Sequence, residues 1–374
     1  MFHPIAPRPS RRETLKVIAG LTACAALPAV SRAGTAVPEP IGDVARRAGI
    51  LFGTSIADDT LDRPGQAELY RRHARIFTAD WALKFNTLRP APDVFDTRYA
   101  DRLLGFSDDA GIPMRGHTLA WNEMKPDWLV AMSTAERAAF LDRHVDETAG
   151  RYAGRLHSWD VVNEPFWPGH GLPGGWRDGP WTATFGTDYP VRAFKRAAAA
   201  DPGCKLVLNE AHTEQWTDTG AGIRAGLLSL VDRLQDAGCR LDAVGLQGHL
   251  QPQWPYDDQG FVEFLWRLAE KGVDIYLTEL DVNDERYPDD PLIRDAAVAD
   301  RYEAFLGAVL KVPAVKTVIT WQLTDAATFY IDAWKQTHPG VTTRAPRPLP
   351  FDAQMQPKAG YDAIVAAFRD RRPA

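Results

Sequence analysis

The sequence of 374 residues predicts a single (β/α)₈ TIM barrel, an α/β fold in which eight parallel strands alternate with helices. From about residue 50, short apolar runs alternate eight times with longer amphipathic segments. Such runs are typical of parallel strands that are buried on both faces. A doubly wound sheet would instead carry a glycine-rich phosphate turn after an early strand. The first run, LFGTS, lacks the G-x-G-x-x-G pattern, so the barrel is favoured.

Eight apolar runs are expected to form the strands of the barrel. Their short length, β-branched content and flanking Gly or Pro favour strands over helices. The predicted strands cover residues 49–56, 81–86, 113–121, 156–164, 205–210, 243–250, 274–282 and 315–323.

Amphipathic segments between these runs predict the helices. Ser133 and Glu136 have the spacing of a capping box at the start of one helix. Gly272 stands where another helix is expected to end, since glycine readily adopts the left-handed conformation found there. The clearest helical segments are residues 134–154, 221–238, 261–272 and 299–311.

The composition is that of an ordinary soluble enzyme, with 45% hydrophobic and 25% charged residues. The net charge of −6, with no basic block, argues against a nucleic-acid partner. Twelve tryptophans are more unusual, because their flat apolar faces suit stacking on ligands such as sugars. We expect the protein to be a monomer.

Residues 1–33 are interpreted as a twin-arginine export signal. Ser10 to Lys16 read SRRETLK, and the apolar run that follows ends in SRA, which favours cleavage after Ala33. The run is too short to span a membrane stably. Residues 34–374 then form one catalytic domain, which is periplasmic or secreted. An alternative is lipoprotein-type processing at Cys24, which would leave the protein lipid-anchored.

Two further cysteines, Cys204 and Cys239, each lie just before a predicted strand. A disulfide between them is conceivable in an oxidising compartment, and two free thiols are the alternative. Two isolated thiols without clustered histidines make a poor metal site, so we expect neither a metal nor another cofactor.

Seven of the eight predicted strands end in polar or aromatic side chains, where packing alone would place apolar ones. Active sites of TIM barrels lie at these carboxyl ends. The residues are Lys84, His117, Trp121, Asn163, Glu164, Asn209, Glu210, Gln247, His249, Glu279, Asp281 and Trp321. The insert at residues 167–181, rich in Trp and Gly, follows the strand that carries Glu164. It is too long for a plain turn, and we expect it to shape one end of a cleft.

Glu164 and Glu279 end strands that lie roughly opposite each other in an eight-stranded barrel. Paired carboxylates surrounded by amides and aromatic rings are typical of glycoside hydrolysis. One carboxylate attacks the anomeric carbon, and the other, when protonated, assists departure of the leaving oxygen. Side chains that reach inward from these strands can approach to about 5–5.5 Å, the separation found in retaining enzymes.

Four motifs resemble glycoside hydrolase family 10 in their order and in their strand positions: RGHTLAW at 115–121, WDVVNE at 159–164, GLQGHL at 245–250 and TELDV at 278–282. The resemblance covers about residues 45–370. It implies a retaining (β/α)₈ barrel without a cofactor, and most members of the family are endo-β-1,4-xylanases.

The resemblance implies that Glu164 is the acid/base and Glu279 the nucleophile. Asn163 would bind the 2-hydroxyl of the sugar at the cleavage site, a contact that strengthens in the transition state. His249 would orient the nucleophile, and Asp281 would fix the tautomer and charge of His249. Positions 279 and 281 share one face of a strand, so both carboxylates can reach the same histidine.

The resemblance also implies which residues contact the sugars. Lys84, His117 and Gln247 would bind hydroxyl groups, and Trp121 and Trp321 would form the apolar walls. We expect four further residues to contribute to substrate binding: Asp80, Trp81, Asn209 and Phe329.

Several positions depart from the family pattern. Asp80 and Trp81 stand where a Glu-Asn pair is usual, and Asn122 and Met124 replace a His and a Gln after the third strand. Each lost hydrogen bond to a sugar hydroxyl costs about 0.5–1.5 kcal/mol.

Two aromatic positions also differ: Ala211 replaces a tyrosine platform, and Phe329 replaces a second tryptophan. Three hypotheses follow: a xylanase, a glycosidase acting on another β-linked glycan such as an exopolysaccharide or a decorated hemicellulose, and a non-catalytic carbohydrate-binding protein.

Overall fold

The structure is a computed structural model that describes residues 38–337 and 344–371. Within these ranges, the residues from Glu39 onward form one compact unit. The predicted export signal at residues 1–33, including Cys24, lies outside the described residues.

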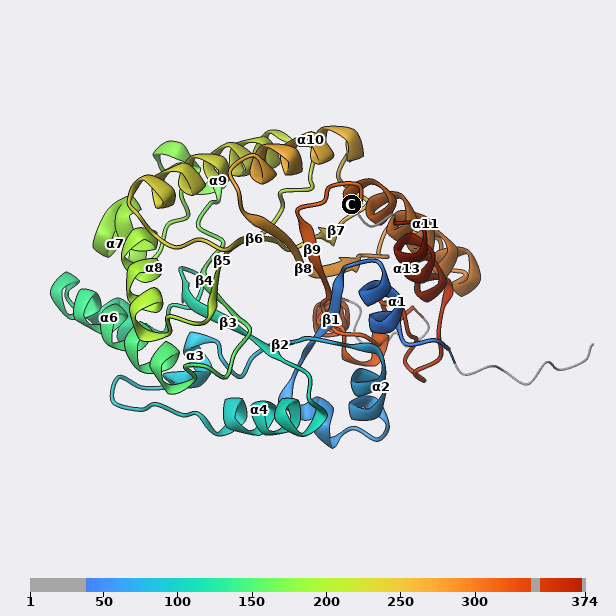
Figure 1. Cartoon of the computed structure of the whole chain (residues 1–374), viewed down its shortest axis with the longest axis horizontal. Coiled ribbons are helices and arrows are strands. Elements are labelled where there is room, and N and C mark those ends of the chain that lie inside the picture. Colours follow the sequence, from blue (N-terminus) through green and yellow to red (C-terminus); the bar gives the residue numbers. More distant parts are fainter. Residues whose placement is uncertain (1–37, 338–343, 372–374) are drawn as a thin grey trace, which may run out of the picture. The chain divides into compact units, whose positions relative to one another are not determined.

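Eight parallel strands close into a barrel, which confirms the predicted fold class (Figure 1). The order around the barrel is β6-β5-β4-β3-β2-β1-β9-β8, and pairing of β6 with β8 closes it. The short β7 pairs only with β8. The bounds are β1 Leu51–Ile56, β2 Phe77–Ala79, β3 Met114–Trp121, β4 Ser158–Asn163, β5 Lys205–Glu210, β6 Ala243–Leu246, β7 His249–Leu250, β8 Asp274–Val282 and β9 Val315–Thr320.

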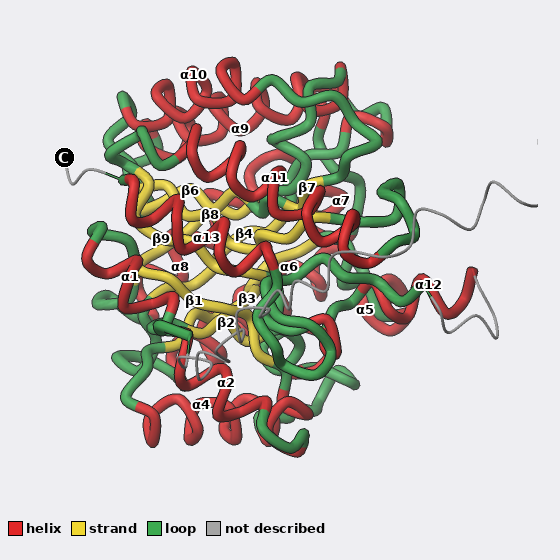
Figure 2. The backbone as a smooth tube through the Cα atoms, turned by 90° about the vertical axis from the view of Figure 1, so that its right-hand side faces the viewer, coloured by secondary structure: helices red, strands yellow, loops and turns green. Residues whose placement is uncertain are grey.

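Helices surround the strands in both views (Figures 1 and 2). The bounds are α1 Ile41–Arg47, α2 Gln66–His73, α3 Phe85–Leu88, α4 Arg98–Ala110, α5 Asp127–Ala131, α6 Thr134–Arg151, α7 Pro180–Phe185, α8 Tyr189–Ala200, α9 Asp218–Asp236, α10 Asp258–Ala269, α11 Pro291–Val309, α12 Tyr330–Thr337 and α13 Ala359–Asp370.

The four helices predicted above are α6, α9, α10 and α11, and α11 begins eight residues earlier than expected, at Pro291. The capping box is present at the start of α6, where Ser133 and Glu136 each bond the backbone N–H of the other. Gly272 adopts a φ of +77° shortly after α10 ends, as its predicted role requires.

The second strand differs from the prediction. Residues 81–86 do not form a strand, and β2 lies upstream at Phe77–Ala79. Trp81 is 54% exposed, whereas all three residues of β2 are buried. Phe85 begins the short helix α3, and its ring packs on Trp128 and Phe140 of the neighbouring segment. Lys84 therefore follows the strand in a turn.

The sixth predicted strand, residues 243–250, is interrupted in its middle. Gly248 adopts a φ of +75°, a left-handed conformation that breaks the strand into β6 and β7. The chain beyond the break pairs with β8, where His249 lies opposite Asp281. The interruption therefore brings His249 beside the strand that carries Glu279.

Among the described residues, Cys204 and Cys239 are free thiols, and both are buried. The predicted alternative of a disulfide is not formed. Burial raises the pKa of the Cys204 thiol to about 12, so this group stays protonated.

Every helix within residues 38–337 and 344–371 is too short or too polar to cross a lipid bilayer.

Candidate active site

The carboxyl ends of β4, β5 and β8 bring the two candidate glutamates into one hydrogen-bonded network. The Asn209 amide donates to Glu279 Oε1 and to Asn163 Oδ1, each at 2.8 Å. The Asn163 amide in turn donates to Glu164 Oε1 at 3.3 Å. Two amides thus connect the two carboxylates across the mouth of the barrel.

Glu279 is buried with 5% exposure, yet its surroundings favour the ionised form. Burial alone would raise its pKa. A hydrogen bond from His249 and attraction to His117, His249 and Lys84 outweigh burial and lower the pKa to about 2. An ionised carboxylate at this position is the state that a nucleophile requires.

His249 lies between two carboxylates. Its Nε2 faces Glu279 Oε2 at 3.3 Å and its Nδ1 faces Asp281 Oδ2 at 2.9 Å. The Tyr330 hydroxyl donates to the other oxygen of Asp281 at 3.0 Å. Although burial opposes the charge, Asp281 and Glu279 raise the pKa of His249 well above its ordinary value. His249 therefore contacts Glu279 through one ring nitrogen and Asp281 through the other, between two carboxylates that favour its charged form.

Asp281→Asn is expected to lower kcat/KM roughly 10- to 100-fold and to move its acidic limb to higher pH. The variant takes an anion away from His249, which lowers the pKa of His249 and weakens its hold on Glu279. The pKa of Glu279 then rises, so its carboxylate becomes protonated at a higher pH. The measurement is the pH profile of kcat/KM, with Asp300→Asn on an exposed face as control.

The free energy of unfolding tests the contact between His249 and Asp281 independently of activity. Because the pKa of His249 is higher in the folded state than in the unfolded state, its protonation stabilises the fold. This stabilisation is fully present below the unfolded-state pKa of about 6.5, and it is lost as the pH rises through the folded-state pKa. The stability deficit of Asp281→Asn should therefore be larger at pH 6 than at strongly alkaline pH. An equal deficit at both values would contradict the charge assignment.

Glu164 follows β4 in a left-handed backbone conformation, with φ +48°. Its backbone N–H donates to the Asn209 carbonyl at 2.9 Å. The Gln247 amide donates to Glu164 Oε1 at 2.8 Å, and Arg177 pairs with Oε2 at 3.0 Å. Only 14% of the side chain is exposed. Its carboxylate is therefore fixed by partners on both oxygens.

Lys84 lies among the three tryptophans expected near the sugar. Its ammonium is 4.1 Å from the Trp81 ring centroid, 5.6 Å from Trp121 and 5.4 Å from Trp321. Asp80 pairs with Lys84 at 3.6 Å. The predicted substrate-binding residues at this end of the barrel thus form one cluster of rings around a cation.

A groove of about 500 Å³ adjoins this cluster. Asp80, Trp81 and Phe329 line it, together with charged residues that include Asp58, Asp59, Arg63, Asp332 and Lys335. Trp81 and Phe329 are exposed large aromatic side chains at 54% and 45%. Both rings are therefore available to a ligand in this groove.

His117 is oriented from inside the barrel. Its Nδ1 lies 2.9 Å from Asp160 Oδ2, and Arg115 pairs with the same carboxylate. The His117 ring packs edge-on against Trp321, with centroids 5.5 Å apart. Asp160 and Arg115 were not among the predicted site residues, although both lie within the motifs that carried the resemblance.

Two buried amide side chains near the strand ends are hydrogen-bonded to other protein groups. Asn209 is fully buried, and its amide oxygen accepts from Thr278 while its nitrogen serves Asn163 and Glu279. Its side-chain hydrogen bonds therefore go to Glu279 and to two neighbouring protein side chains. Asn122 is also buried and accepts the backbone N–H of Trp181 at 3.0 Å. It ties the end of β3 to the insert.

The most important residues that the sequence reasoning missed are Arg177 and Tyr330, which contact Glu164 and Asp281. Arg177 is an isolated cation in the insert beside the cleft, which was a usable signal. Tyr330 offered no such signal, because it lies outside all four motifs and outside every predicted strand.

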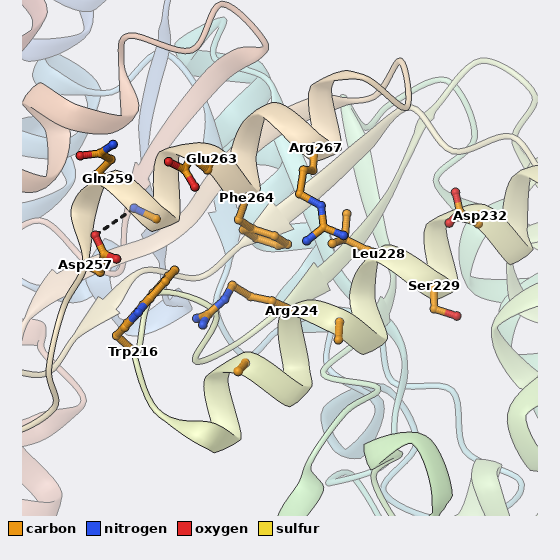
Figure 3. A pocket seen from close by; sticks show the side chains of 13 residues that line it. Trp216, Arg224, Leu228, Ser229, Asp232, Asp257, Gln259, Glu263, Phe264 and Arg267 are labelled. Carbon is orange, nitrogen blue, oxygen red and sulfur yellow. Dashed lines mark hydrogen bonds between the residues drawn. The ribbon is translucent and has the colours of Figure 1, made fainter.

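Another groove, of about 730 Å³, lies outside the barrel between α9 and α10 (Figure 3). Its lining includes Trp216, Arg224, Asp257, Glu263 and Arg267. None of the predicted site residues belongs to that lining. Within the described ranges, no three His, Cys, Asp or Glu residues are grouped so that they could hold a metal ion.

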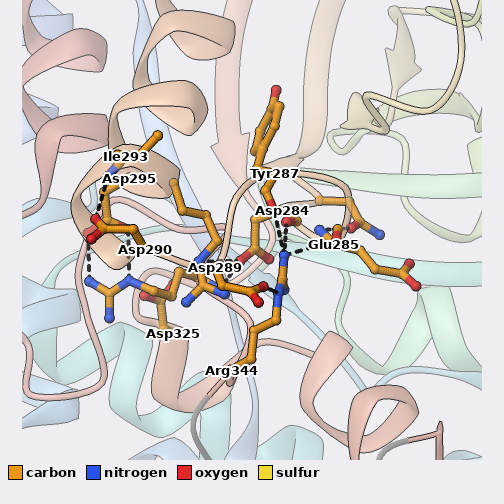
Figure 4. Close-up of polar contacts among 12 residues, drawn as sticks. Asp284, Glu285, Tyr287, Asp289, Asp290, Ile293, Asp295, Asp325 and Arg344 are labelled. Carbon is orange, nitrogen blue, oxygen red and sulfur yellow. Dashed lines mark hydrogen bonds and ion pairs between the residues drawn. The ribbon is translucent and has the colours of Figure 1, made fainter. Parts of the chain in front are cut away.

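The loop after β8 is held by buried and bridging charges (Figure 4). Arg344 Nη2 donates to the carbonyls of Asp284, Glu285 and Tyr287 at 2.7–3.1 Å. Asp284 also pairs with Arg294 at 3.3 Å. These contacts fix the chain directly beyond the strand that carries the nucleophile candidate.

A closed parallel barrel with paired glutamates, amides and aromatic rings at its carboxyl end defines a glycoside hydrolase of the TIM-barrel class. Within that class, the chain belongs to glycosyl hydrolase family 10, whose profile matches residues 40–367. This confirms the family indicated by the motifs.

Similar proteins carry the names of xylanases. Endo-1,4-beta-xylanase 5 of Pyricularia oryzae is 30% identical over 383 residues, covering 98% of this chain and 89% of the relative. Endo-1,4-beta-xylanase B of Paenibacillus barcinonensis is 31% identical, with 80% and 90% covered. The crystal structure of xylanase B from Clostridium stercorarium F9 superposes with a TM-score of 0.75 at 28% identity, covering 88% of this chain and 99% of that one.

Proposed function

We propose that this protein is a retaining endo-β-1,4-xylanase that hydrolyses internal β-1,4-xylosidic bonds. Membership of the family and the names of its relatives support the substrate. The observation that carries the mechanism is the network in which Asn163 and Asn209 connect Glu164 with Glu279. A non-catalytic binding protein would have no need of an ionised Glu279 oriented by a charged histidine.

The first step forms a covalent intermediate. A carboxylate oxygen of Glu279 attacks the anomeric carbon, and the glycosidic C–O bond breaks. The bonding electron pair goes to the leaving oxygen, which takes the proton of the Glu164 carboxyl group. Asn163 binds the 2-hydroxyl of the reacting sugar, where its hydrogen bond strengthens as positive charge develops.

The second step releases the sugar. Glu164, now a carboxylate, accepts a proton from water while the water oxygen attacks the anomeric carbon. Glu279 leaves as a carboxylate, and Glu164 is again protonated. Two inversions at one carbon give net retention. His249 and Asn209 hold Glu279 in the same place in both steps.

Substrate binding is assigned to the ring cluster. Lys84, His117 and Gln247 bind sugar hydroxyls, and Trp121 and Trp321 form the apolar walls. Trp81 and Phe329 offer exposed rings to the next sugar in the groove lined with Asp80. Stacking there replaces hydrogen bonds that the family usually makes at these positions.

We also propose that residues 1–33 direct export by the twin-arginine route and that residues 34–374 act as one monomeric catalytic domain. The compact unit that begins at Glu39 and the family match at residues 40–367 support this boundary. Free secretion or periplasmic residence is favoured over a lipid anchor at Cys24.

Product analysis on a panel of β-linked polysaccharides tests the substrate. Xylan should yield xylo-oligosaccharides of mixed length from the start of the reaction, as internal cleavage requires. Release from another β-glycan with none from xylan would replace the proposed substrate. Turnover of no glycan, with binding retained, would overturn the enzymatic function.

A further inference from the structure

The side chain of Arg177, in the insert at residues 167–181, contacts both the backbone and the side chain of the proposed acid/base, Glu164. Arg177 Nε donates to the Glu164 carbonyl at 2.8 Å, and Nη2 pairs with Glu164 Oε2 at 3.0 Å. The third guanidinium nitrogen donates to Glu123 Oε1 at 2.5 Å. With 5% exposure, Arg177 is buried between the insert and the end of β4.

The arginine is itself fixed in place. Its backbone N–H donates to the Pro165 carbonyl at 2.8 Å, and its carbonyl accepts from the Thr182 hydroxyl at 2.8 Å. Its guanidinium carbon lies 5.5 Å from the Trp167 ring centroid. A rigid guanidinium held in this way fixes the position of the carboxylate oxygen that it pairs with, relative to the backbone carbonyl of the same residue.

Glu164 needs such support. Its left-handed backbone, φ +48°, is unfavourable for a residue with a side chain and persists only where neighbours hold it. Gln247 and Asn163 fix Oε1 of the carboxylate, while Arg177 binds Oε2 and the carbonyl of the same residue. Among these partners, only Arg177 comes from the insert.

We propose that Arg177 is the positioning residue for acid/base catalysis, through which the insert at residues 167–181 aims the Glu164 carboxyl group at the leaving oxygen. The inference rests on the proposed function, since it assigns proton transfer to Glu164. Arg177 acts through Glu164, whose Oε2 and backbone carbonyl it contacts. Its influence is therefore confined to steps in which Glu164 moves a proton.

The test uses substrates that differ in their need for protonation. Fluoride leaves without general-acid assistance, whereas a sugar alkoxide does not. For Arg177→Lys, which keeps a charge but lacks the planar fork, kcat/KM for xylotetraose should fall roughly 10- to 100-fold. The value of kcat/KM for fluoride release from β-xylobiosyl fluoride, which reports the first step alone, should stay within about 3-fold of the unchanged protein.

A purely structural arginine would give another pattern. Arg137 in α6 donates hydrogen bonds to the Thr184 hydroxyl and to the carbonyls of Val130 and Met132, and it does not contact Glu164. Arg137→Lys is the matched control and should lower both activities equally, if at all. Equal losses on the two substrates in Arg177→Lys, or no loss on either, would overturn the positioning role.

Glu123→Gln provides a second variant should Arg177→Lys fold poorly. It removes the charge that holds the far side of the guanidinium and should lower the xylotetraose rate more than the fluoride rate. Equal effects would again overturn the inference. Failure of the unchanged protein to hydrolyse either substrate would instead refute the proposed function, so the two failures are distinguishable.

Discussion

Glu279→Ala is expected to lower kcat on xylan by roughly 10⁴-fold or more, because no glycosyl ester can form without the nucleophile. Reducing-sugar release measured over days, compared with the unchanged protein, gives the factor. Glu303→Ala, which removes an exposed carboxylate from α11, is the matched control and should retain full activity. Substantial turnover by the Glu279 variant would show that another group attacks the anomeric carbon.

Stereochemistry gives this prediction a second readout. Azide can enter the space left by the shortened side chain and attack the anomeric carbon of 2,4-dinitrophenyl β-xylobioside, whose leaving group needs no proton. A single inversion then gives the α-xylobiosyl azide, which NMR distinguishes from the β form. A β product from the Glu279 variant would contradict its assignment as the nucleophile.

The barrel was predictable because parallel strands buried on both faces leave a clear apolar signal. β3 and β8 coincide closely with their predicted runs. The second strand was misplaced because β2 has only three residues, while the apolar run at 81–86 contains Ala82, Leu83 and Phe85, which are buried in the core without forming a strand. Trp81 is exposed there, and Lys84 is buried among aromatic rings. Composition could not distinguish these roles from strand burial.

The candidate site was predictable where a residue lies in a strand end, and less so where it acts through a distant contact. The family motifs implied the pairing of His249 with Asp281, and the structure places the two residues opposite each other on β7 and β8. The contact between Arg177 and Glu164 depends on how the insert folds back over β4, since its short turns at Pro168–His170 and Pro173–Gly175 reverse the chain. The hydrophobic pattern of the sequence does not predict how an irregular insert of this kind folds.

Asn209 illustrates a further limit. Its position at the end of β5 indicated a functional residue, and the structure agrees that it faces the site. Its partners, however, are the side chains of Asn163, Thr278 and Glu279, all of them from other strands of the barrel. Whether a polar strand-end residue binds a ligand or another protein group depends on the side chains that neighbouring strands place beside it. The position of the residue in the sequence does not define those neighbours.

Glu164→Ala should lower kcat/KM for phenyl β-xylobioside roughly 10²- to 10⁴-fold, the usual contribution of general-acid catalysis. The first step with 2,4-dinitrophenyl β-xylobioside should be nearly unaffected, because that phenolate departs unprotonated. The second step still lacks its base, so the glycosyl ester on Glu279 should accumulate after an initial burst of phenolate. Stopped-flow absorbance measures the burst, and intact-protein mass spectrometry detects the ester.

Added azide completes the distinction between the two glutamates. In Glu164→Ala the ester on Glu279 still forms, so azide attacks an already inverted carbon and the product is the β-xylobiosyl azide. The same reagent therefore gives opposite anomers in the two variants only if Glu279 attacks and Glu164 transfers the proton. Equal losses on both aryl substrates, with no burst and no azide product, would remove Glu164 from proton transfer. The contact with Arg177 would then serve only to fold the insert.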